Sequence, residues 1–203
     1  MKNSSIPVYT DDEKMYYADT CKPIKKAVLE GKISVYALKR GNYPGTEIKE
    51  DEVSGIKSIG YWDITKPQEW GLPWHRNEGI EISYLEHGSL PFEVFGGREY
   101  HLQANDLTIT RPWQPHRIGN PDISNSCLFW MIIDVEVRRP HQEWKWPDWI
   151  ILSKNDLDVL TNLLRENERP VWATNEKMRR RITELKKSVL GALRGDSYSM
   201  VQI

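Results

Sequence analysis

The chain has 203 residues, with 28 Lys and Arg against 29 Asp and Glu, which gives a formal charge of -1 at pH 7. This balance excludes a protein that is basic overall, so an acidic partner would have to meet a local patch. The 2 cysteines, Cys21 and Cys127, lie too far apart for a disulfide framework or a structural zinc knuckle.

Targeting and membrane signals are missing from the sequence pattern. The first residues hold no apolar segment of the kind found in signal peptides, and the longest apolar run, residues 128–133, is too short to cross a bilayer. We therefore expect a cytoplasmic protein that has no membrane partner.

The first two predicted segments are an N-terminal arm over residues 1–31 and a β domain over residues 32–152. The arm contains a short helix at 22–30, with Pro23 in its first turn and Gly31 after its end. The clearest hairpin has Gly96 and Gly97 at its turn, and we expect both to supply positive φ angles. Short β-type runs separated by Gly, Pro and Asn predict strands at 32–38, 56–62, 79–86, 90–95, 98–102, 106–111 and 127–137.

The third predicted segment, residues 153–203, has helical periodicity. Ser153 and Asp156 form an N-terminal capping pair for one helix, and a second helix should run from about 174 to 194. We expect a helical hairpin that forms a homodimer contact or covers the barrel. The apolar stripe proposed for that contact consists of Met178, Ile182, Leu185 and Val189.

Four polar residues in the predicted β domain require an explanation: His75, Asn77, Glu81 and His116. Positions 75, 77 and 81 share parity, so on a continuous strand their side chains would leave the same face. A buried carboxylate needs a cation, a proton or a metal ion. Two imidazoles and a carboxylate are the ligand set that leaves open coordination positions on a divalent ion. The alternative is a hydrogen-bonded polar network without a metal.

The spacing of His75, Asn77, Glu81 and Gly88 resembles the first motif of the cupins, with Asn in place of the second His. Residues 105–120 resemble the second motif, in which Asn105 stands for the usual Gly, Arg111 and Trp113 replace Pro and Gly, and His116 is kept. The resemblance implies a mainly β, cupin-type β barrel (a double-stranded β-helix or jelly roll). It also implies that His75, Glu81 and His116 bind a metal such as Fe, Zn, Mn or Ni, with Asn77 as a weak further ligand.

A narrower resemblance covers almost the whole chain. Residues 75–119, followed by helices, resemble the N-terminal sensing and dimerisation half of AraC-type transcription regulators. The resemblance implies a small-molecule effector, often a sugar, bound in the barrel, and a homodimer formed by the helices. DNA would be contacted only through a helix-turn-helix domain, which we do not expect within this chain.

Aromatic and cationic residues near the motifs are candidates for the walls of an effector pocket, with core packing or exposed loop positions as the alternative. Arginines beside the mouth of a barrel would bind a carboxylate or a hydroxyl-rich effector. The predicted pocket consists of Trp74, Tyr84, Arg111, Trp113, Arg117 and Trp130.

Two functions follow from this sequence. The first is the effector-sensing and dimerisation domain of an AraC-type transcription regulator, with no catalytic residue. The second is a metal-dependent cupin enzyme, a dioxygenase or an isomerase, that uses the same three ligands. The two motif segments hold no obvious further acid or base, which favours the sensor.

Overall fold

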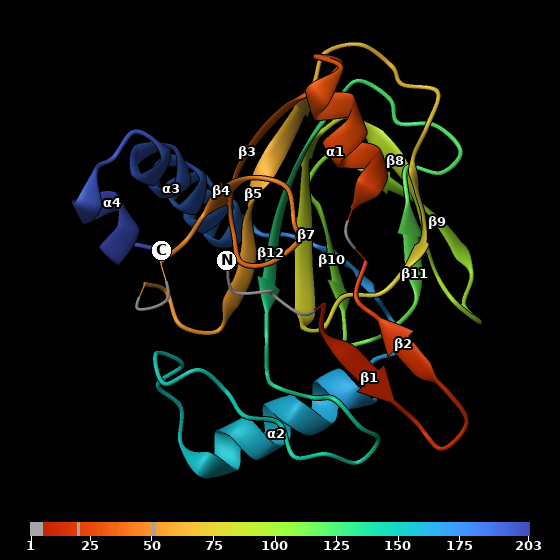
Figure 1. Cartoon of the computed structure of the whole chain (residues 1–203), viewed down its shortest axis with the longest axis vertical. Coiled ribbons are helices and arrows are strands. Elements are labelled where there is room, and N and C mark those ends of the chain that lie inside the picture. Colours follow the sequence, from red (N-terminus) through yellow and green to blue (C-terminus); the bar gives the residue numbers. More distant parts are fainter. Residues whose placement is uncertain (1–5, 20, 50–51) are drawn as a thin grey trace.

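The computed structural model describes residues 6–19, 21–49 and 52–203, and its main feature is a pair of β-sheets (Figure 1). The larger sheet contains β3 (Ser34–Lys39), β4 (Thr46–Glu47), β5 (Ile56–Ile64), β7 (Ile80–His87), β10 (Asp106–Thr110), β12 (Ser126–Ile133) and β13 (Val171–Ala173). The smaller sheet contains β6 (Leu72–His75), β8 (Ser89–Val94), β9 (Glu99–Gln103) and β11 (His116–Ile118). A separate hairpin consists of β1 (Val8–Thr10) and β2 (Met15–Tyr17).

The strand orders are β13-β10-β7-β12-β5-β3-β4 in the larger sheet and β6-β11-β8-β9 in the smaller one. Each of the seven predicted strands is present, with ends that differ by a few residues. The strands that the sequence pattern did not predict are β1, β2, β4, β6, β11 and β13. Each has only two to four residues, so no alternating pattern can develop within it.

The predicted hairpin forms from β8 and β9, with Glu93 opposite Glu99. Gly96 has a φ of 79°, which an L-residue adopts only at a cost. Gly97 is not among the residues with positive φ, and its N–H donates to the carbonyl of Val94 at 2.9 Å. The expectation of two positive φ angles is therefore wrong for Gly97, because this turn needs a left-handed residue only at its third position.

The main core lies between the two sheets. Alternate residues of β5 face opposite sides, so Trp62 and Ile64 pack in this core while Ile59 and Tyr61 pack on the outer face. The smaller sheet contributes Leu72, Leu90 and Phe92 to the same core cluster, together with further buried residues of both sheets.

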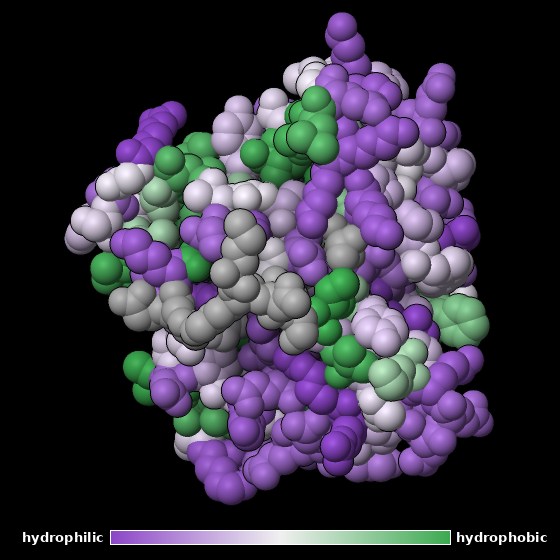
Figure 2. Space-filling model, viewed as in Figure 1, coloured by the Kyte–Doolittle hydropathy of each residue, from purple (hydrophilic) through white to green (hydrophobic). Residues whose placement is uncertain are grey.

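Helix α1 (Lys22–Leu29) lies over the opening between the two sheets (Figure 1). Its buried side chains, Ile24 and Ala27, belong to the main core cluster, and so does the preceding residue Cys21. Val28 and Leu29 are exposed at its C-terminal end, where Figure 2 shows apolar surface. The helix therefore closes one end of the barrel with one face and meets solvent with the other.

Helix α3 (Glu176–Leu193) covers the outer face of the larger sheet. Ile182 and Val189 are buried in a cluster with Ile59 and Phe129, and Leu185 packs against that cluster. The stripe predicted as a dimer contact is therefore used within the chain, because the outer face of the sheet is itself apolar. Of its four residues only Met178 is exposed, at 39%. The short helix α4 (Ser197–Val201) packs against α3.

Helix α2 (Lys154–Arg165) begins as predicted, since the side chain of Ser153 accepts a hydrogen bond from the N–H of Asp156 at 3.2 Å. Its buried residue Leu164 packs in a third cluster with Trp113 and Trp144. Helices α2 and α3 do not form the expected hairpin, because β13 lies between them in the chain and pairs with β10. Within the described residues, no helix combines the length and the apolar character needed to cross a bilayer.

Candidate metal centre

The structure brings His75, Glu81 and His116 together, and each offers a ligand atom within 4.8 Å of the others. His75 is the last residue of β6, and His116 is the first residue of β11 and its cross-strand partner. Glu81 comes from β7 in the opposite sheet. The expected convergence is confirmed, but a continuous strand is not its cause, because residues 76–79 lie between β6 and β7 and connect the two sheets.

Both imidazoles are held in the same way. The Nδ1 atom of His75 lies 2.7 Å from the carbonyl oxygen of Pro73, and that of His116 lies 2.9 Å from the carbonyl oxygen of Gln114. Because a carbonyl oxygen only accepts, each Nδ1 carries a proton and donates. The Nε2 atoms are therefore the ones available to a metal ion.

The carboxylate of Glu81 is held on both oxygens. Its Oε1 accepts from the hydroxyl of Ser83 at 2.9 Å, and its Oε2 accepts from Nε2 of His116 at 3.0 Å and from the amide of Asn77. The amide oxygen of Asn77 lies 3.3 Å from the hydroxyl oxygen of Tyr43, whose one proton points to Glu78 in the shorter of its two contacts. Asn77 thus lies between Glu81 and Tyr43, and its role as a weak further ligand stays a prediction.

Burial and charge set the protonation of the three residues. Burial alone would raise the pKa of Glu81, but the hydrogen bond and charge of His116 outweigh it and lower that pKa to about 2. Burial opposes the charged form of His116, yet contact with Glu81 raises the pKa of His116. For His75, burial and the charge of His116 lower the pKa to about 4. The cluster thus combines a carboxylate of lowered pKa with two imidazoles whose pKa values are shifted in opposite directions.

These residues fit a divalent metal ion. Two Nε2 atoms and a carboxylate oxygen are a donor set used by Fe(II), Mn, Ni and Zn, and three protein ligands leave open positions. The fixed Nδ1 protons leave Nε2 of each ring as the atom that a metal ion would bind. An ion at this place would replace the proton that His116 shares with Glu81, so its affinity would fall at low pH.

A buried acid beside the cluster was not found by sequence reasoning. Glu78 is 2% exposed, burial raises its pKa, and it accepts a hydrogen bond from the hydroxyl of Tyr43. Tyr43 lies in the connection between β3 and β4, where no periodic pattern marks it. Polar contacts thus run from Glu78 through Tyr43 and Asn77 to Glu81.

The cluster opens onto a small cavity of about 30 Å³ inside the barrel. This volume is close to that of a single water molecule. Most of the wall is apolar and comes from both sheets and from α1. The lining residues are Cys21, Ile24, Tyr43, Pro44, Trp62, Leu72, His75, Asn77, Glu81, Ile118, Leu128, Trp130 and Ile132.

Trp130 is the one residue of the predicted pocket that lines this cavity, and its indole N–H donates to the hydroxyl of Ser58 at 2.8 Å. Tyr84 leaves the opposite face of β7, packs in the outer cluster and donates to the side chain of Asn105 at 3.0 Å. Trp113 is buried in the cluster beside α2, where its N–H donates to the carbonyl of Val137 at 2.6 Å.

The remaining predicted pocket residues lie outside the barrel. Trp74 is 42% exposed, with the guanidinium of Arg117 5.1 Å above its ring. Arg117 forms ion pairs with Glu93 and Glu99 on the neighbouring strands. Arg111 donates to the carbonyl of Asn167 at 3.2 Å, so it ties β10 to the segment after α2. None of the three lines the barrel cavity as the structure describes it.

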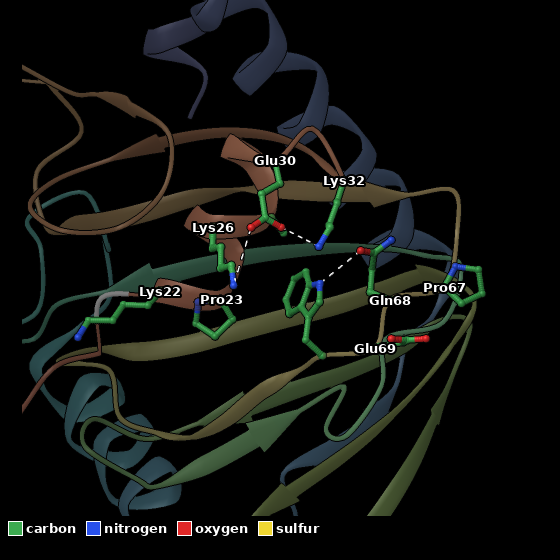
Figure 3. A pocket seen from close by; sticks show the side chains of 10 residues that line it. Lys22, Pro23, Lys26, Glu30, Lys32, Pro67, Gln68 and Glu69 are labelled. Carbon is green, nitrogen blue, oxygen red and sulfur yellow. Dashed lines mark hydrogen bonds and ion pairs between the residues drawn. The ribbon is translucent and has the colours of Figure 1, made fainter.

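A larger groove of about 750 Å³ lies on the outer side of α1 (Figure 3). Glu30 forms ion pairs with Lys26 at 3.8 Å and Lys32 at 2.7 Å, and the indole of Trp70 donates to Gln68 at 3.3 Å. The groove does not include the metal-binding candidates. Helix α1 separates it from the barrel cavity, since Ala27 lines the groove and Ile24 lines the cavity.

Comparison with known families agrees with this geometry. Residues 62–132 match the family model of the Cupin domain, a segment that contains His75, Glu81 and His116. With the two facing sheets, the match identifies the expected cupin-type β barrel followed by helices. No curated protein matches the chain.

Several solved structures match about half of the chain. A cupin superfamily protein from Desulfitobacterium hafniense DCB-2 is 10% identical, over 50% of this chain and 78% of that chain, with a TM-score of 0.35. YhhW from Escherichia coli is 20% identical, over 52% of this chain and 46% of that chain, with a TM-score of 0.41. The DMSP lyase DddQ from Ruegeria pomeroyi DSS-3 is 16% identical, over 55% of this chain and 52% of that chain, with a TM-score of 0.35.

Proposed function

We propose that this chain, which contains a cupin domain, binds a divalent metal ion and a small molecule in its barrel and acts as a ligand sensor. The observation that carries the proposal is the convergence of His75, Glu81 and His116, of which His75 and Glu81 line a mostly apolar cavity inside the barrel. In this proposal the chain is the sensing and dimerisation part of an AraC-type transcription regulator. DNA would be read by a helix-turn-helix domain outside this sequence.

The position of α1 supports a sensing role. Cys21 and Ile24 line the cavity of about 30 Å³, so a ligand larger than this space would have to move part of the wall, and α1 supplies one part of it. A ligand that binds one position of α1 better than another shifts the population between the two positions. The surface of the chain near α1 would then differ between the free and the bound state, and this difference would be transmitted to the dimer.

The cavity argues against a sugar as the effector. A sugar ring carries hydroxyls on all sides, and each would need a partner after leaving water. The described wall offers polar groups mainly at the end that holds His75, Asn77 and Glu81. We therefore propose a compact effector with a largely apolar body.

A metal-dependent enzyme is the second candidate, and the pair of Tyr43 and Glu78 favours it. Tyr43 lines the cavity and donates to Glu78, so a buried carboxyl group whose pKa is raised by burial lies one hydrogen bond from the wall. A bound ion would supply a Lewis acid that polarises an oxygen of the substrate. Tyr43 and Glu78 would then deliver or accept a proton at the tyrosine hydroxyl.

The first experiment is the metal content of the purified chain, measured by elemental analysis on protein that has met neither chelator nor nickel resin. We expect about one equivalent of a divalent metal, with loss of that metal in Glu81→Gln and His116→Ala. The exposed residue His101 provides the control, since His101→Ala should keep the metal. A metal-free wild-type protein, or variants that retain the metal, would refute the metal centre.

A second experiment separates the sensor from the enzyme. The metal-loaded chain is incubated with compounds that raise its melting temperature, and both the compound and the assembly state are followed. If the chain is a sensor, the compound stays chemically unchanged and the sedimentation behaviour of the protein changes. Turnover that disappears in Tyr43→Phe would instead establish the enzyme.

A further inference from the structure

The indole N–H of Trp62 is the buried polar side-chain atom that lacks a hydrogen-bond partner in the described part of the chain. Trp62 is 1% exposed, lies on β5 and lines the same cavity as His75 and Glu81. Leaving a buried donor without an acceptor is costly, and proteins satisfy nearly all such groups. An unpaired donor at the wall of a cavity indicates that an acceptor enters that cavity.

Trp130 provides an internal comparison. The two indoles lie side by side with ring centroids 6.2 Å apart, and both line the cavity. The N–H of Trp130 already donates to Ser58, whereas the N–H of Trp62 has no acceptor among the residues that the structure describes. The difference means that the fold satisfies one indole by itself and leaves the other for a molecule from outside.

From this geometry we infer that Trp62 is a specificity-determining residue, whose N–H binds an oxygen acceptor on the small molecule that the barrel takes. This inference rests on the proposed function and names a residue and a ligand class within it. An indole N–H donates and never accepts, so the group it binds is a carbonyl, ether, hydroxyl or carboxylate oxygen.

The rest of the wall limits the ligand further. No Lys or Arg is among the described residues that line the cavity, so phosphates and other multiply charged anions would lack a protein counter-charge there. Leu72, Ile118 and Leu128 would contact an apolar body. The ligand class is therefore a short-chain oxygen compound with one acceptor placed for Trp62.

Helix α1 determines how such a compound would enter. The cavity of about 30 Å³ accepts only a small part of a four-carbon compound while Ile24 stays in place. We therefore expect binding to involve displacement of α1, and slow exchange between the free and the bound protein.

The test uses the indole N–H signals in two-dimensional ¹H–¹⁵N NMR spectra of the zinc-loaded chain, assigned by Trp62→Phe and Trp130→Phe. The probes are 2-butanone and butanoate, with 2-methyl-1-butene as a compound of similar shape that lacks the oxygen. We expect an oxygen-bearing probe to shift the Trp62 signal downfield and to leave the Trp130 signal nearly unchanged. The hydrocarbon should not produce the downfield shift.

The affinity test uses Trp62→Phe and a control outside the cavity. Trp62→Phe should bind the probe about ten-fold more weakly, and Trp172→Phe, at an exposed position on β13, should bind it with less than about a three-fold change. Zinc stoichiometry and the dispersion of the spectrum check that each variant is folded. The inference is overturned if no probe moves the Trp62 signal. It is also overturned if the indole N–H of Trp62 binds only a water molecule. Loss of zinc binding in the wild type would instead refute the proposed metal centre.

Discussion

His75 and His116 lie opposite each other on neighbouring antiparallel strands, with ring centroids 4.2 Å apart and both rings buried. Each ring donates from Nδ1 to the carbonyl oxygen of the residue two positions earlier. Glu81 contacts only one of them, His116, by a hydrogen bond, and this contact raises the pKa of His116, whereas burial and the charge of His116 lower the pKa of His75. One strand pair thus holds two imidazoles whose pKa values are shifted in opposite directions.

The lowered pKa of His75 predicts a pH dependence of stability in metal-free protein. Burial and the charge of His116 lower the pKa of His75 to about 4 from 6.5, so between these values the unfolded chain binds a proton that the folded chain does not. The free energy of unfolding should therefore fall as the pH drops from 6.5 to 4, by about 3 kcal/mol from this residue. The raised pKa of His116 acts in the opposite direction, since its stabilisation is lost as the pH rises.

Urea unfolding at several pH values, with a chelator present, measures this effect. His75→Asn should flatten the acid side of the profile, and His101→Asn, at an exposed position, should leave it as in the wild type. An unchanged slope in His75→Asn would mean that this ring is protonated in the folded protein as well.

Asn77 offers a test of whether it binds the metal or only orients Glu81. Its amide donates to Glu81, so Asn77→Ala should weaken metal affinity about ten-fold and leave the stoichiometry unchanged. Metal titration monitored by calorimetry gives both quantities. Asn162→Ala, at an exposed position on α2, is the matched control. Complete loss of the metal in Asn77→Ala would identify Asn77 as a ligand.

Gly71 allows β6 and β11 to approach each other. A Cβ atom at this position would lie 1.8 Å from the carbonyl oxygen of Gly119, so Gly71→Ala must push the two segments apart. We expect a loss of about 1–3 kcal/mol in the free energy of unfolding and, because His75 and His116 share this strand pair, weaker metal binding.

Gly96→Ala is the control for that prediction. Nothing lies within 4 Å of a Cβ at Gly96, although its φ of 79° costs about 1 kcal/mol for alanine. This variant should lose stability and keep its metal affinity. Equal metal affinity in Gly71→Ala and the wild type would show that the strand pair adapts without moving the ligands.

We predict that replacement by Phe lowers the free energy of unfolding by different amounts at the two cavity tryptophans. Trp130→Phe removes the donor to the buried hydroxyl of Ser58, which costs about 1–3 kcal/mol beyond the lost volume. Trp62→Phe removes a donor that has no partner among the described residues. Removal of this unpaired donor offsets part of the free energy of unfolding that is lost with the volume of the indole. We expect Trp62→Phe to be less destabilising by about 1 kcal/mol in urea unfolding. A larger cost for Trp62→Phe would indicate a partner that stays in the cavity without ligand.

Strand pattern and motif spacing predicted the barrel and its three candidate ligands, because both depend on local sequence. The Asn105 and Trp113 positions, where the cupin motif has glycine, have φ values of 77° and 64°, so the local backbone is kept even though the residues differ. Parity could also have excluded Tyr84, which leaves the opposite face of β7 from Glu81.

Other parts of the site depend on contacts that no local pattern contains. Tyr43 reaches the cavity from an irregular connection, and Cys21 and Ile24 reach it because α1 packs over the end of the barrel. The helical stripe indicated an apolar partner for α3, but it could not distinguish the outer face of the sheet from a second copy of the chain.

Val189 tests that last distinction. It is 0% exposed and packs in the cluster between α3 and the larger sheet, so Val189→Ala should cost about 2 kcal/mol in the free energy of unfolding. Met178→Ala, at a position that is 39% exposed, should cost much less. Because the contact is within one chain, the loss of melting temperature in Val189→Ala should be the same at low and high protein concentration. A loss that shrinks as the concentration rises would place Val189 in a contact between two copies.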